Sequence, residues 1–282
     1  MDGEASWIRR ALFLLAFACL ASCAAWTRTE AGDYRVFELE VGRDAQHLHW
    51  GHRGTDARLD LFVLSPGEVR IWEPSGAVFP ATPTSTVRLP GEASLVDFGD
   101  VTGDAGEEIV LVNRRGVWAD GPAPAAARGK GSGSAPGSGP GSAGDEVLAG
   151  SFRRIVAVTG VPVPLEHVHS AFIRDITADG QADLIVPVRG GYEIYHKRGN
   201  KFEKGVSLEG EHKVVVDPGG PGILDPLELE IRIAHLKFKD LNGDGRLDIL
   251  ARTREKTRCY LQGPSGFPPR PAYELDLARF RE

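Results

Sequence analysis

Cysteine is scarce in this chain of 282 residues, and the three that occur are Cys19, Cys23 and Cys259. Three thiols spaced in this way cannot form the disulfide framework that holds many small secreted domains together, so a hydrophobic core must hold the fold. The apolar run at 11–21 is also short, at about eleven residues, whereas a helix needs about 20 to cross a bilayer. That run is therefore not expected to span a membrane.

The chain also lacks an excess of positive charge and the common catalytic motifs. Its 33 Lys and Arg are outnumbered by 39 Asp and Glu, which gives a net charge of −6. Nucleic acid is excluded as the main partner, because phosphate binding needs a concentrated Lys/Arg face. No Gly-x-Ser-x-Gly, Walker loop, His-Glu-x-x-His or Cys-x-x-Cys sequence occurs. No nucleophile with its base is identified, which predicts a non-enzymatic protein.

Glycine and proline, by contrast, are abundant, with 35 and 19 residues. Hydrophobic residues at 41% and charged residues at 26% are close to the values of globular proteins. This composition predicts a folded chain of many short strands joined by tight turns.

The N-terminus has the pattern of a targeting segment. Arg9 and Arg10 precede the apolar run, as in a signal peptide. The run ends in Leu-Ala-Ser-Cys at 20–23, which resembles the lipobox of bacterial lipoproteins. The resemblance implies a signal peptide over 1–22, acylation of Cys23 as the first mature residue, and a tether over 23–33. Two alternatives are an ordinary signal peptide cut near Ala25, giving a secreted or periplasmic protein, and an uncleaved anchor.

The resemblance to a lipobox also implies a cellular location. Ala24, rather than Asp, follows the cysteine, which by resemblance favours the outer membrane of the bacterial cell envelope. Acyl chains on Cys23 would anchor the protein to the membrane, because each buried CH₂ contributes about 0.8 kcal/mol.

Four segments share an acidic pattern and are each followed by an apolar run. They are HRGTDARLD at 52–60, DVTGDAGEE at 100–108, DITADGQAD at 175–183 and DLNGDGRLD at 240–248. The apolar runs are typical of buried strands. An aromatic residue follows twelve positions after the last acidic residue in three segments, at Trp72, Tyr195 and Tyr260, and two positions earlier in the second, at Trp118. We expect Trp72, Tyr195 and Tyr260 to lie in the core.

The spacing of the four segments indicates an internal repeat with insertions. The segment at 119–144 consists mainly of Gly, Ser, Ala and Pro and is expected to be a solvated loop. A milder insertion lies at 217–226. Without the longer insertion the repeat is about 50 residues, enough for four short strands.

The fourth acidic segment offers a set of hard oxygen ligands. Side chains at its positions 1, 3, 5 and 9 and the carbonyl at position 7 suit Ca²⁺, which takes six to eight oxygens. Mg²⁺ prefers a stricter octahedron with more water, and Zn²⁺ prefers nitrogen and sulfur. An EF-hand is excluded because position 12 is Ala251 instead of Glu, and strands flank the loop.

From Tyr34 to Phe267 the chain resembles the FG-GAP and VCBS repeat family, whose blades carry a D-x-[DN]-x-D-G-x-x-D loop between strands. The resemblance implies an all-β fold over 34–282, a β-propeller of about four blades that is open or incomplete. It also implies two or three Ca²⁺ ions. Three such ions would bring the net charge of −6 to about zero. The ligands it implies are Asp240, Asn242, Asp244, the Arg246 carbonyl and Asp248; Asp175, Thr177, Asp179, the Gln181 carbonyl and Asp183; and Asp100, Thr102, Asp104, the Gly106 carbonyl and Glu108.

The second and first loops depart from that pattern. Ala105 replaces the expected glycine and Glu108 the expected aspartate in the second loop. The first loop keeps only Asp56 and Asp60, so we expect it to hold no ion.

Two histidine pairs, His47 with His49 and His167 with His169, each place two imidazoles on one face of a strand. This spacing can hold zinc, although no third ligand is identifiable, and ordinary packing is the simpler interpretation. Cys259 is expected to be an inert thiol.

The favoured function is a calcium-stabilised surface lipoprotein whose propeller faces bind protein or carbohydrate. One alternative is a polysaccharide-processing enzyme of the propeller type, with the histidine strands and Arg174 or Lys237 at its centre. The other is a truncated fragment without independent activity.

Overall fold

A computed structural model of the chain describes residues 38–54, 56, 58–121, 148, 152–162, 166–217 and 228–277. The chain divides into two compact units, Met1–Glu38 and Leu39–Glu282, and the fold described below belongs to the second. The predicted signal peptide at 1–22, the tether with Cys23, and nearly all of the insertion at 119–144 lie outside the described residues.

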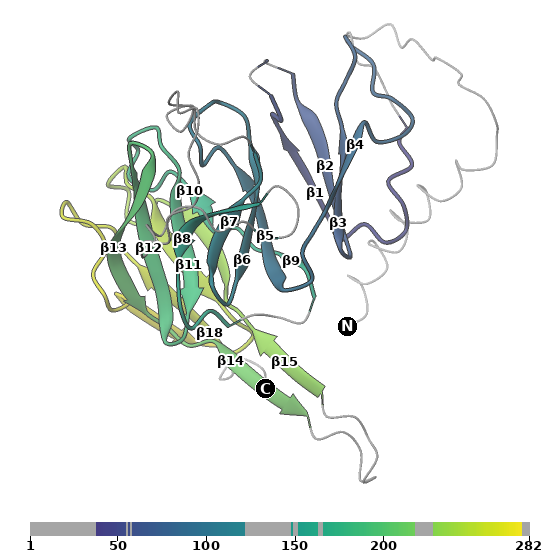
Figure 1. The fold of residues 1–282 in the computed structure, drawn as a ribbon. Helices are drawn as coiled ribbons and strands as arrows, with labels where there is room; N and C mark the ends of the chain where they lie inside the picture. Colours follow the sequence, from purple (N-terminus) through teal and green to yellow (C-terminus); the bar gives the residue numbers. More distant parts are fainter. Residues whose placement is uncertain are drawn as a thin grey trace, which may run out of the picture. The chain divides into compact units, whose positions relative to one another are not determined.

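The described residues form strands, turns and loops without a helix, which confirms the predicted all-β class. No helix in this part of the chain is long and apolar enough to cross a membrane. Figure 1 shows the strands coloured in chain order.

Four of the sheets are built around antiparallel meanders in which strands that follow one another in sequence pair with each other. The first sheet contains β1 (His47–Gly51), β2 (Asp60–Ser65), β3 (Glu68–Trp72) and β4 (Ser85–Arg88). The second contains β5 (Ala93–Gly99), β6 (Glu108–Asn113), β7 (Gly116–Ala119) and β8 (Arg153–Ala157). The third contains β10 (Ile173–Arg174), β11 (Asp183–Val188), β12 (Gly191–Arg198) and β13 (Lys201–Glu209), and the fourth β16 (His235–Lys239), β17 (Asp248–Arg252), β18 (Lys256–Tyr260) and β19 (Tyr273–Asp276).

Two elements depart from the four-strand pattern. The short strand β9 (Val168–His169) joins the second sheet in parallel to β5, so that sheet has five strands. A separate two-stranded sheet is formed by β14 (Lys213–Asp217) and β15 (Glu228–Arg232), which flank most of the insertion expected at 217–226. None of the sheets in the described part of the chain closes on itself.

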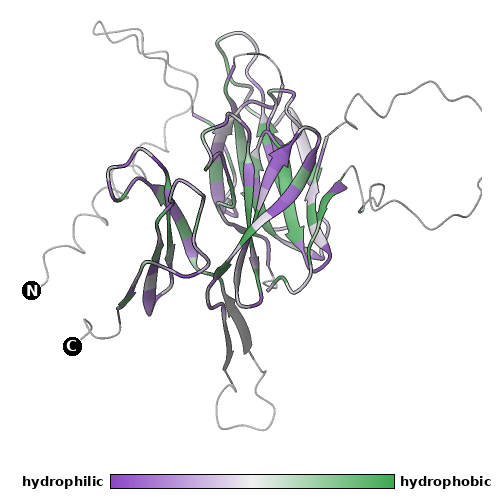
Figure 2. Ribbon diagram, turned by 90° about the vertical axis from the view of Figure 1, so that its left-hand side faces the viewer, coloured by the Kyte–Doolittle hydropathy of each residue, from purple (hydrophilic) through white to green (hydrophobic). Residues whose placement is uncertain are grey.

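Apolar side chains fill the space between sheets that are consecutive in the chain. The second strands β2, β6 and β11 are buried at every residue, because neighbouring elements cover both of their faces. Figure 2 shows hydrophobic segments on the strands and hydrophilic segments at many of the turns. One cluster joins the first and second sheets and includes Phe62, Ile71, Phe98, Leu111 and Trp118.

Equivalent clusters join the later sheets. The second and third sheets share Leu95, Val112, Phe172, Val186 and Tyr195, and the third and fourth share Ile185, Tyr192, Ile249, Tyr260 and Phe267. Trp72, Tyr195 and Tyr260 are 0%, 6% and 0% exposed, which confirms their predicted place in the core. Burying an aromatic side chain of this size removes a large apolar area from water, which stabilises the sheets against each other.

Candidate metal centre

The four acidic segments all lie at the same place in their sheets, between the first and the second strand. The ninth residue of each segment begins the second strand: Asp60 in β2, Glu108 in β6, Asp183 in β11 and Asp248 in β17. These four carboxylates are between 0% and 5% exposed. A buried carboxylate is costly unless hydrogen bonds satisfy it, so each needs donors close by.

One backbone hydrogen bond recurs at this ninth position. The carboxylate accepts a bond from the N–H of the second residue in its segment, over 2.6 Å from Arg53, 2.9 Å from Val101, 3.1 Å from Ile176 and 2.8 Å from Leu241. The bond closes each loop at its base. It holds the ninth carboxylate against the start of the loop even in the first segment, which has His52 and Gly54 where the other loops have an aspartate and a Thr or Asn.

The first aspartate of the second, third and fourth loops is held in a similar way. Asp100, Asp175 and Asp240 each accept a hydrogen bond from the N–H of the sixth residue, at 3.2, 2.9 and 2.9 Å. In all three loops the fourth and sixth residues have left-handed backbone, with φ values between 58° and 86°. Glycine adopts this conformation at little cost, whereas alanine does not. Ala105 and Ala178 occupy two of these positions, at φ 71° and 58°.

The fifth residue of every loop caps the turn that follows it. The carboxylate accepts a bond from the N–H of the seventh residue, at 3.1 Å for Asp56, 3.1 Å for Asp104, 2.9 Å for Asp179 and 2.9 Å for Asp244. The loops are therefore shaped by their own carboxylates. Each carboxylate oxygen has more than one lone-pair direction and can accept a further partner.

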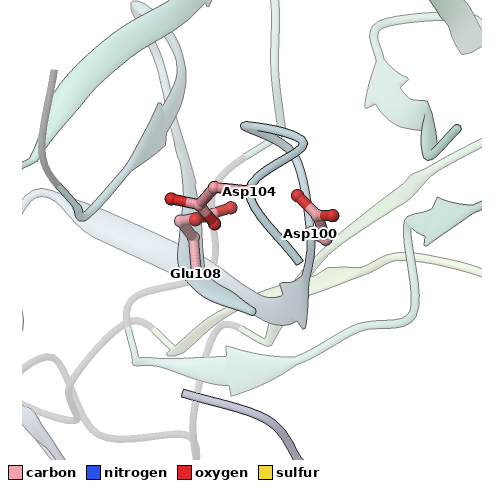
Figure 3. A group of neighbouring side chains, drawn as sticks. All are labelled: Asp100, Asp104 and Glu108. Atoms are coloured by element: carbon pink, nitrogen blue, oxygen red, sulfur yellow. The ribbon is translucent and has the colours of Figure 1, made fainter. Parts of the chain in front are cut away.

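The second loop gathers three carboxylates. One oxygen each from Asp100, Asp104 and Glu108 lies within 4.8 Å of the others, and no other group of three His, Cys, Asp or Glu residues in the described part of the chain meets this limit. Figure 3 shows the carboxylates of Asp104 and Glu108 close together, with Asp100 facing them across the loop. Like charges at this distance repel, so the cluster favours a cation between them.

Electrostatics at Glu108 agree with that geometry. Burial raises the pKa of Glu108 to about 7, and the charge of Asp104 acts in the same direction. The Thr102 hydroxyl donates to Glu108 over 2.9 Å and opposes this shift. Lys197, which is 5% exposed, places Nζ 2.8 Å from where a Cβ on Gly103 would lie. Lys197 therefore places a cation beside the loop, and the Arg53 guanidinium, which interacts with the charge of Glu108, is a second one.

The donor set of the second loop consists of oxygen atoms. Besides the three carboxylates, the hydroxyl of Thr102 and the carbonyl of Gly106 belong to the same loop. Oxygen donors suit a hard cation such as Ca²⁺ better than zinc or copper, which favour nitrogen and sulfur. The residues of this loop thus fit calcium.

The third and fourth loops do not gather their carboxylates in this way. The second oxygen of Asp183 lies 3.1 Å from His196 Nδ1, and that of Asp248 accepts the N–H of Gln262 at 2.9 Å. Both ninth carboxylates are thereby held at the sheet. Glu108 is longer by one CH₂ and extends toward Asp104. In the fourth loop Asp244 also accepts bonds from Asn242 at 3.0 Å and from the Arg246 side chain at 2.7 Å.

The remaining predicted ligands are placed as follows. Thr177 Oγ1 donates to Asp183 at 3.3 Å, and the N–H groups of Gln181 and Arg246 bond within their loops. In the first loop the Asp56 carboxylate pairs with the Arg58 guanidinium, so this carboxylate already has a cationic partner.

Sequence reasoning missed an ion pair that joins the first loop to the second sheet. The Arg53 guanidinium makes two bonds to Asp120, at 2.5 and 3.1 Å, and Asp120 also accepts the Ile109 N–H at 2.6 Å. Asp120 is 1% exposed. Burial opposes the charge on Arg53, but the hydrogen bonds to Asp120 outweigh it and the pKa of Arg53 is raised. Asp120 lies within the segment at 119–144, which the composition assigned to a solvated loop, so the sequence did not indicate that its carboxylate is buried.

Of the two histidine pairs, His47 from the first contacts His169 from the second, whereas His49 and His167 have other partners. His47 stacks on His169, His49 stacks on Phe98 at 4.8 Å between ring centroids, and His49 bonds Glu107 at 2.6 Å. His167 instead bonds the Pro90 carbonyl at 3.1 Å.

The enzyme alternative would place Arg174 or Lys237 at the centre of the protein. Arg174 and Lys237 are exposed on β10 and β16. Cys259 is half-buried on β18, and burial raises the pKa of its thiol. A raised thiol pKa disfavours the reactive thiolate at neutral pH.

Comparison of the sequence with models of protein families and with curated proteins finds no match.

Proposed function

We propose that this protein is a calcium-stabilised scaffold of the FG-GAP/VCBS type, whose sheets form the blades of an incomplete propeller. A lipid on Cys23 would hold it at the bacterial envelope, on the outer membrane. Its faces would bind protein or carbohydrate, and no catalytic step is assigned to it.

One observation carries the proposal: three carboxylates of one loop have oxygens within 4.8 Å of each other. Asp100, Asp104 and Glu108 would hold Ca²⁺ together with the Thr102 hydroxyl and the Gly106 carbonyl. The bound ion would neutralise like charges at the base of β6 and so stabilise the second sheet.

The recurring hydrogen bonds of the four loops support extending this role to the third and fourth loops. In both, the first and fifth carboxylates already accept backbone N–H groups in the same pattern as the second loop. A calcium ion there would need the ninth carboxylate to turn from its present partner toward the loop. We therefore expect weaker binding in the third and fourth loops than in the second.

Calorimetric titration of residues 24–282 with Ca²⁺ tests the proposal. We expect the tightest of the bound ions to disappear in Asp104→Asn, because the amide keeps the cap on Gly106 but removes a charge. The matched control is Asp56→Asn, the same position in the first loop, which should leave the titration unchanged. Absence of calcium binding by the unsubstituted chain, or equal effects of the two variants, would contradict the proposal.

A further inference from the structure

A cavity between the second and third sheets has a charge opposite to that of the whole protein. Its volume is about 550 Å³, which is within the range of small-ligand sites. Its lining includes four cations, Arg114, Arg115, Arg154 and Lys204, and one carboxylate, Glu193. The net charge of the chain is −6. The positive cavity is therefore a local feature and does not follow from the overall composition.

Two of the three arginine side chains in the lining contact an aromatic ring. The guanidinium carbons of Arg115 and Arg154 lie 5.4 and 5.7 Å from the centroid of the Trp118 ring, which is fully buried in the second sheet. Cation–π contacts of this kind orient the guanidinium groups and reduce the entropy that a ligand would have to remove. Arg115 also pairs with Glu92 at 3.1 Å.

The carboxylate that the described residues contribute to the cavity is already engaged within it. Glu193 accepts hydrogen bonds from Lys204 and from the Tyr195 hydroxyl, both at 2.5 Å. Burial disfavours its charge, but these bonds outweigh burial and lower the pKa of Glu193. Lys204 and Glu193 thus offset each other. The lining also contains three arginines, of which Arg115 pairs with Glu92. Arg114 forms no ion pair within the described part of the chain, so the described lining keeps an excess of positive charge.

We propose that this cavity binds an acidic saccharide, with a carboxylate of a uronic acid held by the arginines. Guanidinium groups match the two oxygens of a carboxylate with parallel hydrogen bonds. The hydroxyl of Thr159 and the Glu193–Lys204 pair lie in the same lining and supply partners for sugar hydroxyls. This inference names the ligand class of the proposed binding scaffold, and in that respect it rests on the proposed function.

Titration of the full mature chain with trigalacturonate tests the inference, with neutral maltotriose and inorganic phosphate as the other two arms. We expect trigalacturonate to bind and maltotriose not to bind. We expect Arg114→Glu to weaken binding at least about tenfold, the effect of losing one charged hydrogen-bonding partner. The matched control Arg198→Glu changes an exposed arginine at the end of β12, outside the cavity, and should leave affinity unchanged.

Three results would overturn the inference. They are absence of trigalacturonate binding, equal loss in Arg114→Glu and Arg198→Glu, and phosphate binding as tight as trigalacturonate, which would mean a simple anion site. Calcium-dependent thermal stabilisation is measured on the same samples. If it persists while saccharide binding is absent, only the saccharide inference fails; if saccharide binding persists without calcium stabilisation, the calcium proposal fails instead.

Discussion

The imidazole rings of His47 and His169 stack face to face, with centroids 3.5 Å apart and planes 5° apart. His47 lies on β1 of the first sheet and His169 on β9 of the second, so the contact joins two sheets. Two imidazolium rings could not keep this geometry, because their charges would repel.

Stability should therefore fall in acid. Burial, followed by the charges of His169 and His49, lowers the pKa of His47 to about 4, although Asp97 acts in the opposite direction. The unfolded chain takes up this proton near the ordinary pKa of 6.5. Because the unfolded state then binds more protons, the contribution is fully present above pH 6.5 and is lost as pH falls toward about 4.

The histidine prediction is tested by urea unfolding between pH 7 and pH 4. His47→Phe keeps a flat ring without a titrating group and should flatten the pH dependence. His235→Phe, at an exposed position on β16, is the control and should retain the full slope. An unchanged slope in His47→Phe would contradict this account of the stack.

Replacing alanine by glycine at two loop positions should stabilise the protein. Ala105 and Ala178 have φ values of 71° and 58°, and a left-handed residue with a Cβ costs roughly 1–2 kcal/mol. Ala105→Gly and Ala178→Gly should each raise the free energy of unfolding by up to about 1 kcal/mol, since glycine also loses more entropy on folding. Thermal unfolding measures this. Ala157→Gly, at a position in strand β8, should destabilise the protein instead.

Loss of the buried ion pair should be costly. Asp120→Ala leaves Arg53 without its two bonds and removes the acceptor of the Ile109 N–H, so we expect a loss of about 3 kcal/mol in unfolding free energy. Asp56→Ala removes the partner of Arg58 in an exposed pair and should change stability little. If both variants unfold at the same urea concentration, the Arg53–Asp120 pair does not link the sheets.

Membrane attachment should depend on one cysteine. If Cys23 is acylated, the full chain expressed in a bacterium will enter the detergent phase and incorporate labelled palmitate, and Cys23→Ala will do neither. Cys19→Ala is the control within the same segment. Absence of label from both the unsubstituted chain and Cys19→Ala would favour the alternative of an ordinary signal peptide.

The strands were largely predictable because the sequence pattern and local physics agree. Apolar runs that follow Asp60, Glu108, Asp183 and Asp248 are the second strands β2, β6, β11 and β17. The first three are buried at every residue and β17 at most of them. The aromatic residues at a fixed distance lie in the core. The strands β14 and β15 were not predicted, because their pairing spans a Gly/Pro-rich segment that indicated only an insertion. A strand was expected at His167 and His169, but the sequence did not show that β9 would have only two residues or pair in parallel with β5.

The sequence predicted which loops could hold calcium but not how the carboxylates are arranged within each loop. The fourth loop has the most regular pattern, yet the cluster forms in the second, where Glu108 replaces aspartate. Sequence spacing does not show that Asp183 and Asp248 have partners in their own sheets, His196 and the Gln262 N–H. The Arg53–Asp120 pair could not be found either, because it joins residues 67 positions apart in the sequence.

Thermal unfolding of residues 24–282 in excess Ca²⁺ and in excess chelator tests the central claim, that the acidic loops hold calcium, most directly. At a calcium concentration 100 times the dissociation constant, one ion adds about 2.7 kcal/mol, which for a domain of this size raises the midpoint by roughly 5–10 °C. We predict a rise of at least that size, reduced in Asp104→Asn and retained in Asp56→Asn. Equal midpoints in calcium and in chelator would contradict the claim and leave the loops as hydrogen-bonded turns.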